Sequence, residues 1–329
     1  MDAPLAIVVP EVYRSLFFPA PLWEELNALA PRLVWLPPEQ SSPDVLLARL
    51  ADLDPEVVIT SWGTPSLESL TTPRLRYVCH LCGSVRTLVT REQIAGGLRV
   101  TNWGGAISRT VAEAVLLHIL AGLRRLPDYV RGMPDGYWRG PVPEGRSLYG
   151  RRVGVHGFGQ VARALLPLLR PFGVEVRIHA PDAQEAAALG AEAVPTLEDL
   201  FAGSDIVVEL APLIPETRRI VTESLLRRLP EGGLFINVGR GSIVDEEALT
   251  RVAKEGTRWF GLDVFEDEPL PADHPLRSLP NVLLTPHVAG PTQDRCVDAG
   301  RHGLDNVRRY ATGQPLHSEV TPERYDLAT

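Results

Sequence analysis

Residues 155–162, VHGFGQVA, join a predicted strand to a predicted helix. The run before them, RRVGVH, has the composition of a buried strand, and the run after them, VARALLPLLRPFG, has the apolar spacing of a helix. Gly157 allows a tight turn, Gly159 allows close approach to the backbone, and the small Ala162 lets the helix pack on the strand. Glycine pairs also occur in ordinary turns. The stretch therefore predicts a strand–helix unit that either binds phosphate at the helix N-terminus or is only a turn.

Composition narrows the class of protein. The 329 residues are enough for about two domains, and 44% apolar with 22% charged residues is ordinary for a globular protein. A net charge of −8 argues against nucleic acid or an anionic membrane as the main partner. No apolar run approaches the roughly 20 residues that span a bilayer, and the start, MDAPLAIVVP, lacks the basic region of a signal peptide. A cytoplasmic location is the expectation.

Short apolar runs alternate with helical patterns along the chain. In the first third, strands are predicted at 5–9, 34–36, 57–60 and 77–81, with helices near 22–29 and 43–50. In the second half, strands are predicted at 152–156, 175–179, 205–210, 234–238, 259–264 and 282–285, with helices at 216–229 and 246–255. Such alternation predicts an α/β protein with two doubly wound parallel sheets.

Three further segments lie around these two series. A helix is predicted from Ser108 to about residue 124, and a last helix at 292–311. Residues 126–150 are rich in proline and glycine and contain Tyr137 and Trp138. Without secondary structure of its own this segment is long for a loop, so we expect it to pack on another surface, such as that of a second subunit.

One expected feature of a dinucleotide site is missing. A strand–helix–strand unit that binds a dinucleotide carries an acidic residue about 20 positions after its glycines, where it binds the ribose hydroxyls. Here the second strand ends at Ala180, and Asp182 stands two positions late, behind a proline. No arginine follows closely to bind a 2′-phosphate. The architecture predicts NAD or NADP as the cofactor, with NAD slightly favoured.

Three charged side chains follow predicted strands in the second half, where α/β sheets place their ligands. Taken singly, each has an ordinary explanation: a salt-bridging Arg240, a surface Glu268 in an acidic run, and a turn His287. Together they suit hydride transfer between a nicotinamide and a 2-oxo acid. Arginine pairs with a carboxylate through its planar fork, and histidine gives a proton to the carbonyl oxygen. A carboxylate beside the imidazole orients it and stabilises its protonated form.

The ordered motifs of the chain resemble those of the D-isomer-specific 2-hydroxyacid dehydrogenases. They are HGFGQVA, APLIPETR, GRG, DVFEDEP and TPH, and the resemblance covers nearly the whole chain. It implies a catalytic triad of Arg240, Glu268 and His287, and a homodimer that works mainly as a reductase of glyoxylate, hydroxypyruvate or a bulkier 2-oxo acid. It also implies a Rossmann dinucleotide-binding domain at 105–286, inserted in a flavodoxin-like substrate domain. That second domain would combine residues 1–104 with a helix returning at 287–329.

The resemblance also implies a set of binding residues. In this family, the loop after the fourth N-terminal strand holds the substrate carboxylate through backbone N–H groups. The implied substrate residues are therefore Cys82, Gly83, Ser84, Arg240 and His287. The implied cofactor residues are Gly157, Phe158, Gly159, Gln160, Val161, Ala180, Pro212, Thr217, Val238, Gly239, Asp263 and Gly290.

The cysteines leave two interpretations, of which one is preferred. Cys79 and Cys82 enclose His80 in a C-x-x-C motif, which is typical of a metal or redox site but also of a buried strand end. Zinc needs about four ligands, and Cys296 stands alone, so no metal is expected.

Two departures and three open residues remain. Leu210 stands where many members have histidine, and Ala180 replaces the acidic residue that binds the ribose. Glu268 argues against formate as the substrate, because the formate dehydrogenases of this superfamily carry glutamine there. Trp62, Arg86 and Trp138 are candidates for a pocket wall, a substrate contact or a surface role.

The sequence leaves a second class of function open. A dinucleotide-binding regulatory protein of the corepressor kind uses the same fold and can keep all three charged residues. A relative that acts on a substrate other than a carboxylate is a third reading, in which Arg240 would meet a different anion.

Overall fold

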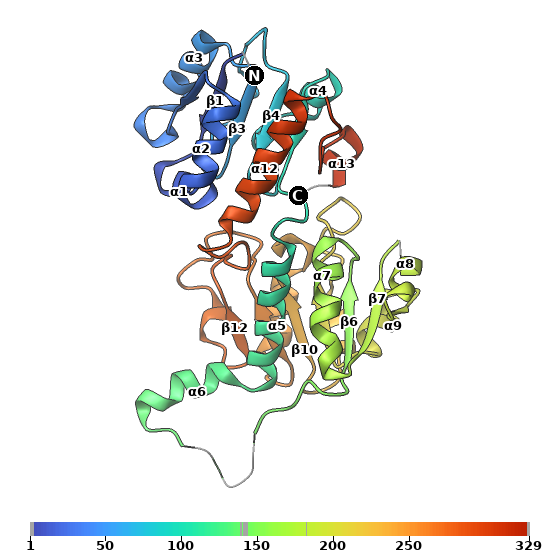
Figure 1. Cartoon of the computed structure of the whole chain (residues 1–329). Coiled ribbons are helices and arrows are strands. Elements are labelled where there is room, and N and C mark those ends of the chain that lie inside the picture. The colour runs from blue at the N-terminus through green and yellow to red at the C-terminus, as the bar shows by residue number, and fades with distance from the viewer. Residues whose placement is uncertain (1–2, 139, 141–143, 182, 328–329) are drawn as a thin grey trace. The chain divides into compact units, whose positions relative to one another are not determined.

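The computed structural model describes residues 3–138, 140, 144–181 and 183–327. The chain divides into two compact units, one made of Met1–Ile107 with Pro291–Thr329 and the other of Ser108–Gly290. Each unit contains a parallel β-sheet of its own (Figure 1). Among the described residues, none of the helices combines the length and the apolarity needed to cross a bilayer.

The unit Ser108–Gly290 is built on a seven-stranded sheet in the order β12-β11-β10-β9-β6-β7-β8. Its strands are β6 (Arg152–His156), β7 (Glu175–His179), β8 (Glu192–Ala193), β9 (Ile206–Glu209), β10 (Leu234–Asn237), β11 (Trp259–Leu262) and β12 (Val282–Leu284). The six predicted strands are confirmed, whereas the two-residue β8 has no apolar run that could announce it. Strand order reverses between β6 and β9, and ligands of such sheets bind beyond the carboxyl ends at that point.

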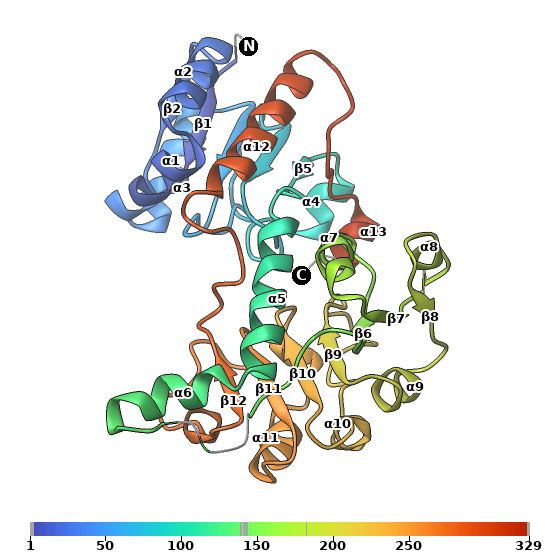
Figure 2. The ribbon, with the colours of Figure 1, turned by 60° about the horizontal axis from the view of Figure 1, so that its bottom comes forward.

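Helices cover both faces of this sheet, which explains why its strands are apolar on both sides. Ile206 and Val208 of β9 lie in a core cluster with residues of α5 and α7, and Val207 lies in a second cluster with residues of α9 to α11. Figure 2 shows α5 and α7 on one side of the strands and α10 and α11 on the other. The helices of this unit are α5 (Ser108–Leu123), α6 (Leu126–Gly132), α7 (Gln160–Leu169), α8 (Ala183–Ala188), α9 (Leu197–Ala202), α10 (Glu223–Arg228) and α11 (Glu246–Lys254). Short 3₁₀ turns lie at η2 (Met133–Asp135), η3 (Arg170–Phe172), η4 (Gly241–Ile243) and η5 (Pro275–Ser278).

The helix predicted at 216–229 is wrong in its first half. The Thr217 hydroxyl donates to Pro212 O at 2.6 Å and accepts from Ile214 N at 2.9 Å, which closes a turn in place of a helix. Arg219 then adopts a left-handed φ of 52°. The helix starts only at α10, where the Thr222 side chain caps it. By contrast, the Asp245 cap of α11 is confirmed.

The segment 126–150, whose proline and glycine content suggests a loop, contains secondary structure. It begins with α6 and η2, and Pro127 fits α6 because it stands in the first turn, where a missing N–H costs nothing. Neither α6 nor η2 has a buried residue. In Figure 1, α6 follows the end of α5 at the rim of the unit.

The other unit is built on a five-stranded sheet in the order β2-β1-β3-β4-β5, the flavodoxin-like order. Its strands are β1 (Leu5–Val8), β2 (Leu33–Trp35), β3 (Val57–Thr60), β4 (Tyr77–His80) and β5 (Arg99–Thr101). Its helices are α1 (Glu11–Phe17), α2 (Ala20–Leu29), α3 (Pro43–Leu53), α4 (Arg91–Ala95), α12 (Cys296–Ala311) and α13 (Pro322–Leu327), with the 3₁₀ turn η1 (Pro38–Gln40). The predicted class of two doubly wound parallel-sheet domains is confirmed.

The returning helix α12 packs on the first segment of this unit at very short range. A Cβ on Gly300 would lie 1.8 Å from Phe17 O, so only glycine lets α12 meet the end of α1 there. Gly303 does the same against Leu81, just after β4. This contact explains why residues after 290 complete a unit that begins at the N-terminus.

Candidate active site

The glycine turn after β6 has two glycines with different constraints. Gly157 has a φ of +92°, and a Cβ there would lie 2.7 Å from Ala211 N, so the protein itself requires this glycine. A Cβ on Gly159 would meet nothing within 4 Å. Gly159 is the N-cap of α7 and leaves the first-turn N–H groups without a side-chain cap. Open space beside uncapped helix N–H groups fits the phosphates of a dinucleotide.

The other predicted cofactor residues lie after the strand ends of the same sheet. Ala180 follows β7 and is half-buried against the apolar cluster, Phe158 and Val238 are buried, and Thr217 uses its hydroxyl to close the turn that begins at Pro212. Asp182, the alternative to Ala180, lies outside the described residues. The structure therefore places these candidates around one sheet edge, and none of the described ones offers a charge at the position of the missing acid.

The two glycines give a matched pair of variants. We expect Gly159→Ala to fold with an unchanged melting temperature but to bind NADH or NADPH about ten- to a hundredfold more weakly, because a methyl group would hinder close phosphate contacts. Gly157→Ala should instead lower the melting temperature, because its Cβ meets backbone. Thermal unfolding and fluorescence titration measure both; a Gly159→Ala protein with wild-type affinity would contradict the assigned role.

The His287 and Glu268 side chains are brought together from two different strand ends. Nδ1 of His287 lies 2.6 Å from Glu268 Oε2, and Glu268 Oε1 accepts the Phe265 N–H at 3.0 Å. The imidazole keeps half of its side-chain surface exposed, at 50%. With Nδ1 held by the carboxylate, Nε2 is the nitrogen left for exchange of a proton with another molecule. The neighbouring Glu266 binds Arg219 instead, at 2.7 Å, so the acidic run is not simply a solvated loop.

Arg240 follows β10 in a turn fixed by a buried asparagine. Asn237 donates to Arg240 O at 3.0 Å and accepts the Gly239 N–H at 3.0 Å. Burial lowers the pKa of Arg240, and the charge of Glu268 raises this pKa again in part. Arg240 therefore interacts electrostatically with Glu268, the partner of His287. A Cβ on Gly241 would lie 1.9 Å from Phe265 C, so this glycine lets the Arg240 turn approach the Glu268 loop.

Asp263 is fully buried and organises the segment that carries His287. Its carboxylate accepts the Thr285 hydroxyl at 2.5 Å and the N–H groups of Val288 and Ala289 at 2.9 and 2.8 Å. His287 has a left-handed φ of 54°, which a non-glycine residue adopts at a cost. The three hydrogen bonds to Asp263 hold the residues on both sides of His287 and offset that cost.

In the other unit, the predicted carboxylate loop follows β4 and has its carbonyl groups turned toward the protein. Cys82 O accepts the Trp103 N–H at 3.1 Å, Gly83 O accepts Asn102 Nδ2 at 2.8 Å, and Ser84 makes a backbone hydrogen bond with the His80 ring. Burial lowers the pKa of His80 to about 4, which keeps that ring neutral. Within the described part of the chain, the N–H groups of Gly83 and Ser84 have no protein acceptor. Successive free N–H groups form a site for an anion.

Asn102 provides a test of that loop. We expect Asn102→Ala to raise the KM of a carboxylate substrate about two- to tenfold and to leave dinucleotide affinity unchanged, because one neutral hydrogen bond orients Gly83. Asn27→Ala is the control, since Asn27 also donates to a backbone carbonyl, that of Trp23, within a helix of the same unit. Equal KM values for the two variants would argue against the loop.

The structure places the three cysteines, and also Trp62, Arg86 and Trp138, whose roles the sequence leaves open. Cys79, Cys82 and Cys296 are free and buried, and burial raises the pKa of Cys79 to about 11. In the ranges that the structure describes, no three His, Cys, Asp or Glu side chains are grouped to hold a metal ion. Trp62 lies edge-on to Tyr13 and Trp103, Arg86 donates to the carbonyls of Tyr325 and Asp326, and Trp138 is 75% exposed.

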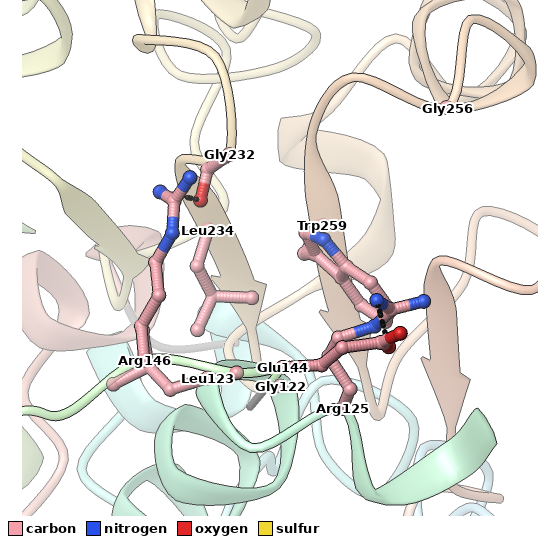
Figure 3. Close-up of a pocket in the computed structure, with 10 residues that line it drawn as sticks. Gly122, Leu123, Arg125, Glu144, Arg146, Gly232, Leu234, Gly256 and Trp259 are labelled. Atoms are coloured by element: carbon pink, nitrogen blue, oxygen red, sulfur yellow. Dashed lines mark hydrogen bonds and ion pairs between the residues drawn. The ribbon is translucent and has the colours of Figure 1, made fainter. Parts of the chain in front are cut away.

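A separate cavity lies at the opposite edge of the seven-stranded sheet (Figure 3). It measures about 330 Å³ and is lined by Leu234 and Trp259, the first residues of β10 and β11. The Arg125 guanidinium stacks on Trp259 and pairs with Glu144, and Arg146 donates to the carbonyl of Gly232. Its position at the amino ends of the strands, with Arg125 already paired, separates it from the edge where such sheets bind ligands.

The sequence did not identify the residues that hold the turns of the site in place. Asn237, Asn102 and His80 act through backbone groups of the turns that they contact. Asn237 directly precedes the V-G-R-G run, so its position in the sequence could have indicated its role in the Arg240 turn. The other two became visible only when the β4 loop and the chain after β5 were seen together.

Comparison with known proteins gives consistent results. A family model described as "D-isomer specific 2-hydroxyacid dehydrogenase, NAD binding domain" matches residues 116–289. The glyoxylate reductase of Korarchaeum cryptofilum is 32% identical over 290 residues, which are 85% of this chain and 86% of that protein.

Two solved structures extend the likeness to both units. An NADPH-dependent glyoxylate/hydroxypyruvate reductase from Sinorhizobium meliloti in complex with citrate is 27% identical, with a TM-score of 0.79 over 97% of each chain. A D-isomer specific 2-hydroxyacid dehydrogenase from Xanthobacter autotrophicus, in complex with NADPH and MES, is 29% identical, with a TM-score of 0.75 over 99% of this chain and 100% of that one.

Proposed function

The chain belongs to the D-isomer-specific 2-hydroxyacid dehydrogenases, and from that premise we propose that it reduces small 2-oxo acids such as glyoxylate or hydroxypyruvate with NADH or NADPH. The observation that carries the proposal is the 2.6 Å contact between His287 and Glu268, together with the electrostatic interaction between Glu268 and Arg240. The relatives named above are reductases and dehydrogenases, which favours an enzyme over a regulatory dinucleotide-binding protein.

A reduced nicotinamide, when bound, would supply the hydride for the carbonyl carbon, and the protein must supply the proton. We assign the proton to His287 Nε2, which donates to the carbonyl oxygen. Glu268 orients the ring through its contact with Nδ1, so that Nε2 faces away from the carboxylate. In the direction of alcohol oxidation, the same nitrogen accepts the proton.

Two groups of the chain suit the carboxylate of the substrate. Arg240 offers a planar fork that pairs with a carboxylate through parallel N–H bonds. In the other unit, the free N–H groups of Gly83 and Ser84, with Cys82 before them, also suit a carboxylate. These donors favour a 2-oxo acid over a simple ketone or aldehyde, because the latter would leave them without an acceptor.

The assay that tests this function follows the loss of absorbance of NADH or NADPH. The panel holds glyoxylate, hydroxypyruvate, pyruvate and bulkier 2-oxo acids, with the matching aldehydes as controls. Both cofactors are needed because Ala180 carries no polar side chain for a 2′-hydroxyl or a 2′-phosphate. Dinucleotide binding without turnover of any 2-oxo acid would refute the enzymatic function and favour a regulatory one.

For the quaternary structure we propose a homodimer formed through α6 and the residues that follow it. Leu126, Val130, Met133 and Trp138 are exposed, and Tyr137 stacks on Tyr129 among them. An apolar surface on a helix without buried residues needs a cover in water. A second copy supplies one, because a two-fold contact presents the same apolar patch from both sides.

Val130 tests the dimer. Val130 is 63% exposed, so Val130→Arg should leave the fold intact and lower the molar mass found by light scattering from two chains to one at micromolar concentration. Val12→Arg is the matched control, since Val12 is 65% exposed on α1 in the other unit. A Val130→Arg protein that keeps the mass of two chains would exclude this interface.

For the cellular location we propose the cytoplasm. The three cysteines are all free thiols, the state that a reducing compartment maintains. Fractionation of cells that express the tagged chain tests the location.

A further inference from the structure

A buried histidine–glutamate pair lies at the glycine turn and takes no part in the chemistry assigned above. His156 ends β6 and Glu209 ends β9, and the two are register partners across the parallel ladder. His156 Nδ1 lies 2.6 Å from Glu209 Oε2, and Glu209 is 0% exposed. Both residues stand at the point where strand order reverses.

A contribution to the stability of the fold does not explain why this buried histidine–glutamate pair is present. Taking two charges out of water costs free energy, and an apolar pair of similar volume is often as stable or more so. The neighbours on both strands, Val155 and Val208, are apolar, so an apolar pair would continue the core. Burial by itself lowers the pKa of His156, but the attraction of the Glu209 carboxylate and the hydrogen bond that the ring donates to it outweigh the effect of burial, so the net shift of the pKa is upward.

The second oxygen of Glu209 points to what the pair does. Glu209 Oε1 accepts the Ala211 N–H at 2.8 Å, while Leu210 N donates to His156 O at 2.9 Å. The backbone of Leu210 and Ala211 is also what a Cβ on Gly157 would strike, at 2.7 to 2.8 Å. One carboxylate therefore fixes the turn after β9 against the glycine turn after β6.

We propose that Glu209 and His156 form a positioning pair for the dinucleotide, which holds the turn after β9 at the distance from the glycine turn that cofactor binding requires. The inference rests on the proposed function, because both turns carry residues assigned to the cofactor, Gly157 and Gly159 on one side and Pro212 on the other. Neither Glu209 nor His156 is assigned a contact with the cofactor. Their effect is on where the N–H groups and the open space of the two turns lie.

The test is the dissociation constant of NADH and of NADPH, measured by fluorescence titration with no 2-oxo acid present. Glu209→Leu removes both hydrogen bonds, and we expect both constants to rise about ten- to a hundredfold. Glu209→Gln keeps an oxygen for the Ala211 N–H and an amide for His156, so its constants should stay within about threefold of wild type. A Glu209→Gln protein as weak as Glu209→Leu would overturn the positioning role, because geometry would then not be what matters.

Asp205 supplies a matched control on the same two strands. Asp205 immediately precedes β9 and binds Arg152, the first residue of β6, at 2.9 Å, so this pair joins the opposite ends of the same strands. Asp205→Leu should lower the melting temperature and leave both dissociation constants unchanged. Equal weakening by Asp205→Leu and Glu209→Leu would show a general effect on the sheet and would overturn the inference.

A double variant keeps the test decisive if Glu209→Leu does not fold. His156→Val with Glu209→Leu restores an apolar core and should recover the melting temperature, yet it still lacks the anchor for Ala211 N–H and should bind the dinucleotide weakly. Wild-type affinity in the folded double variant would overturn the inference. Failure of the wild type to bind any dinucleotide would instead refute the proposed function, so the two failures are distinguishable.

Discussion

Replacing His287 with alanine is expected to lower kcat for 2-oxo acid reduction by about 10²- to 10⁴-fold, the usual contribution of a positioned general acid. The imidazole is held by Glu268 at 2.6 Å through Nδ1, which leaves Nε2 to donate the proton. Affinity for NADH should not change, because the imidazole is assigned to the substrate and not to the cofactor. Steady-state kinetics together with dinucleotide titration measure both quantities.

His274 is the control for that variant. Its Nε2 lies 3.4 Å from Glu246, which makes another histidine–glutamate pair in the same unit with no assigned role in the chemistry. His274→Ala should leave kcat within about twofold. Glu268→Gln should lower kcat less than His287→Ala does, because the ring keeps a hydrogen-bond partner but loses the opposite charge. Unchanged kcat/KM in His287→Ala would show that the proton comes from elsewhere.

Replacing Arg240 with alanine is expected to damage substrate binding as well as turnover. Loss of a charge-assisted fork to a carboxylate should reduce kcat/KM on the order of 10²- to 10³-fold, with a raised KM as part of the effect. Arg240→Lys should recover only part of the loss, since an ammonium group cannot reproduce the two parallel N–H bonds. The KM of the 2-oxo acid, measured at saturating NADH or NADPH, is the informative number.

Arg251 supplies the comparison for Arg240. It binds Glu223 at 2.9 Å on the exposed side of α11, with no role in the site. Arg251→Ala should leave both KM and kcat at the wild-type values. A KM for the 2-oxo acid that stays unchanged in Arg240→Ala would mean that the carboxylate is held by other donors, for which the loop at Gly83 and Ser84 is the candidate.

Much of the fold was readable because apolar periodicity is a local property. The strand before Gly157 and the strand that ends at His179 were located at their observed bounds, since both are short apolar runs between clear breaks. The helix expected from residue 216 failed because the Thr217 hydroxyl competes for backbone groups that a helix would use. The start of α6 was missed because Pro127 suggested a loop. A proline is in fact well suited to the first turn of a helix, where Pro127 stands.

The sequence by itself determined the class of fold, the glycine turn and the three charged residues, because each is announced by residue type within a short segment. The tertiary structure decided what those residues do to one another. It joined His287 to Glu268, placed the Asp263 carboxylate under the His287 loop, and paired His156 with Glu209 across two strands. Contacts between strand ends far apart in the chain depend on sheet order and register, and no local pattern encodes them. The same limit explains why VHGFGQVA predicted the dinucleotide turn but not the buried carboxylate of Glu209, 50 positions after Gly159, that fixes the neighbouring turn.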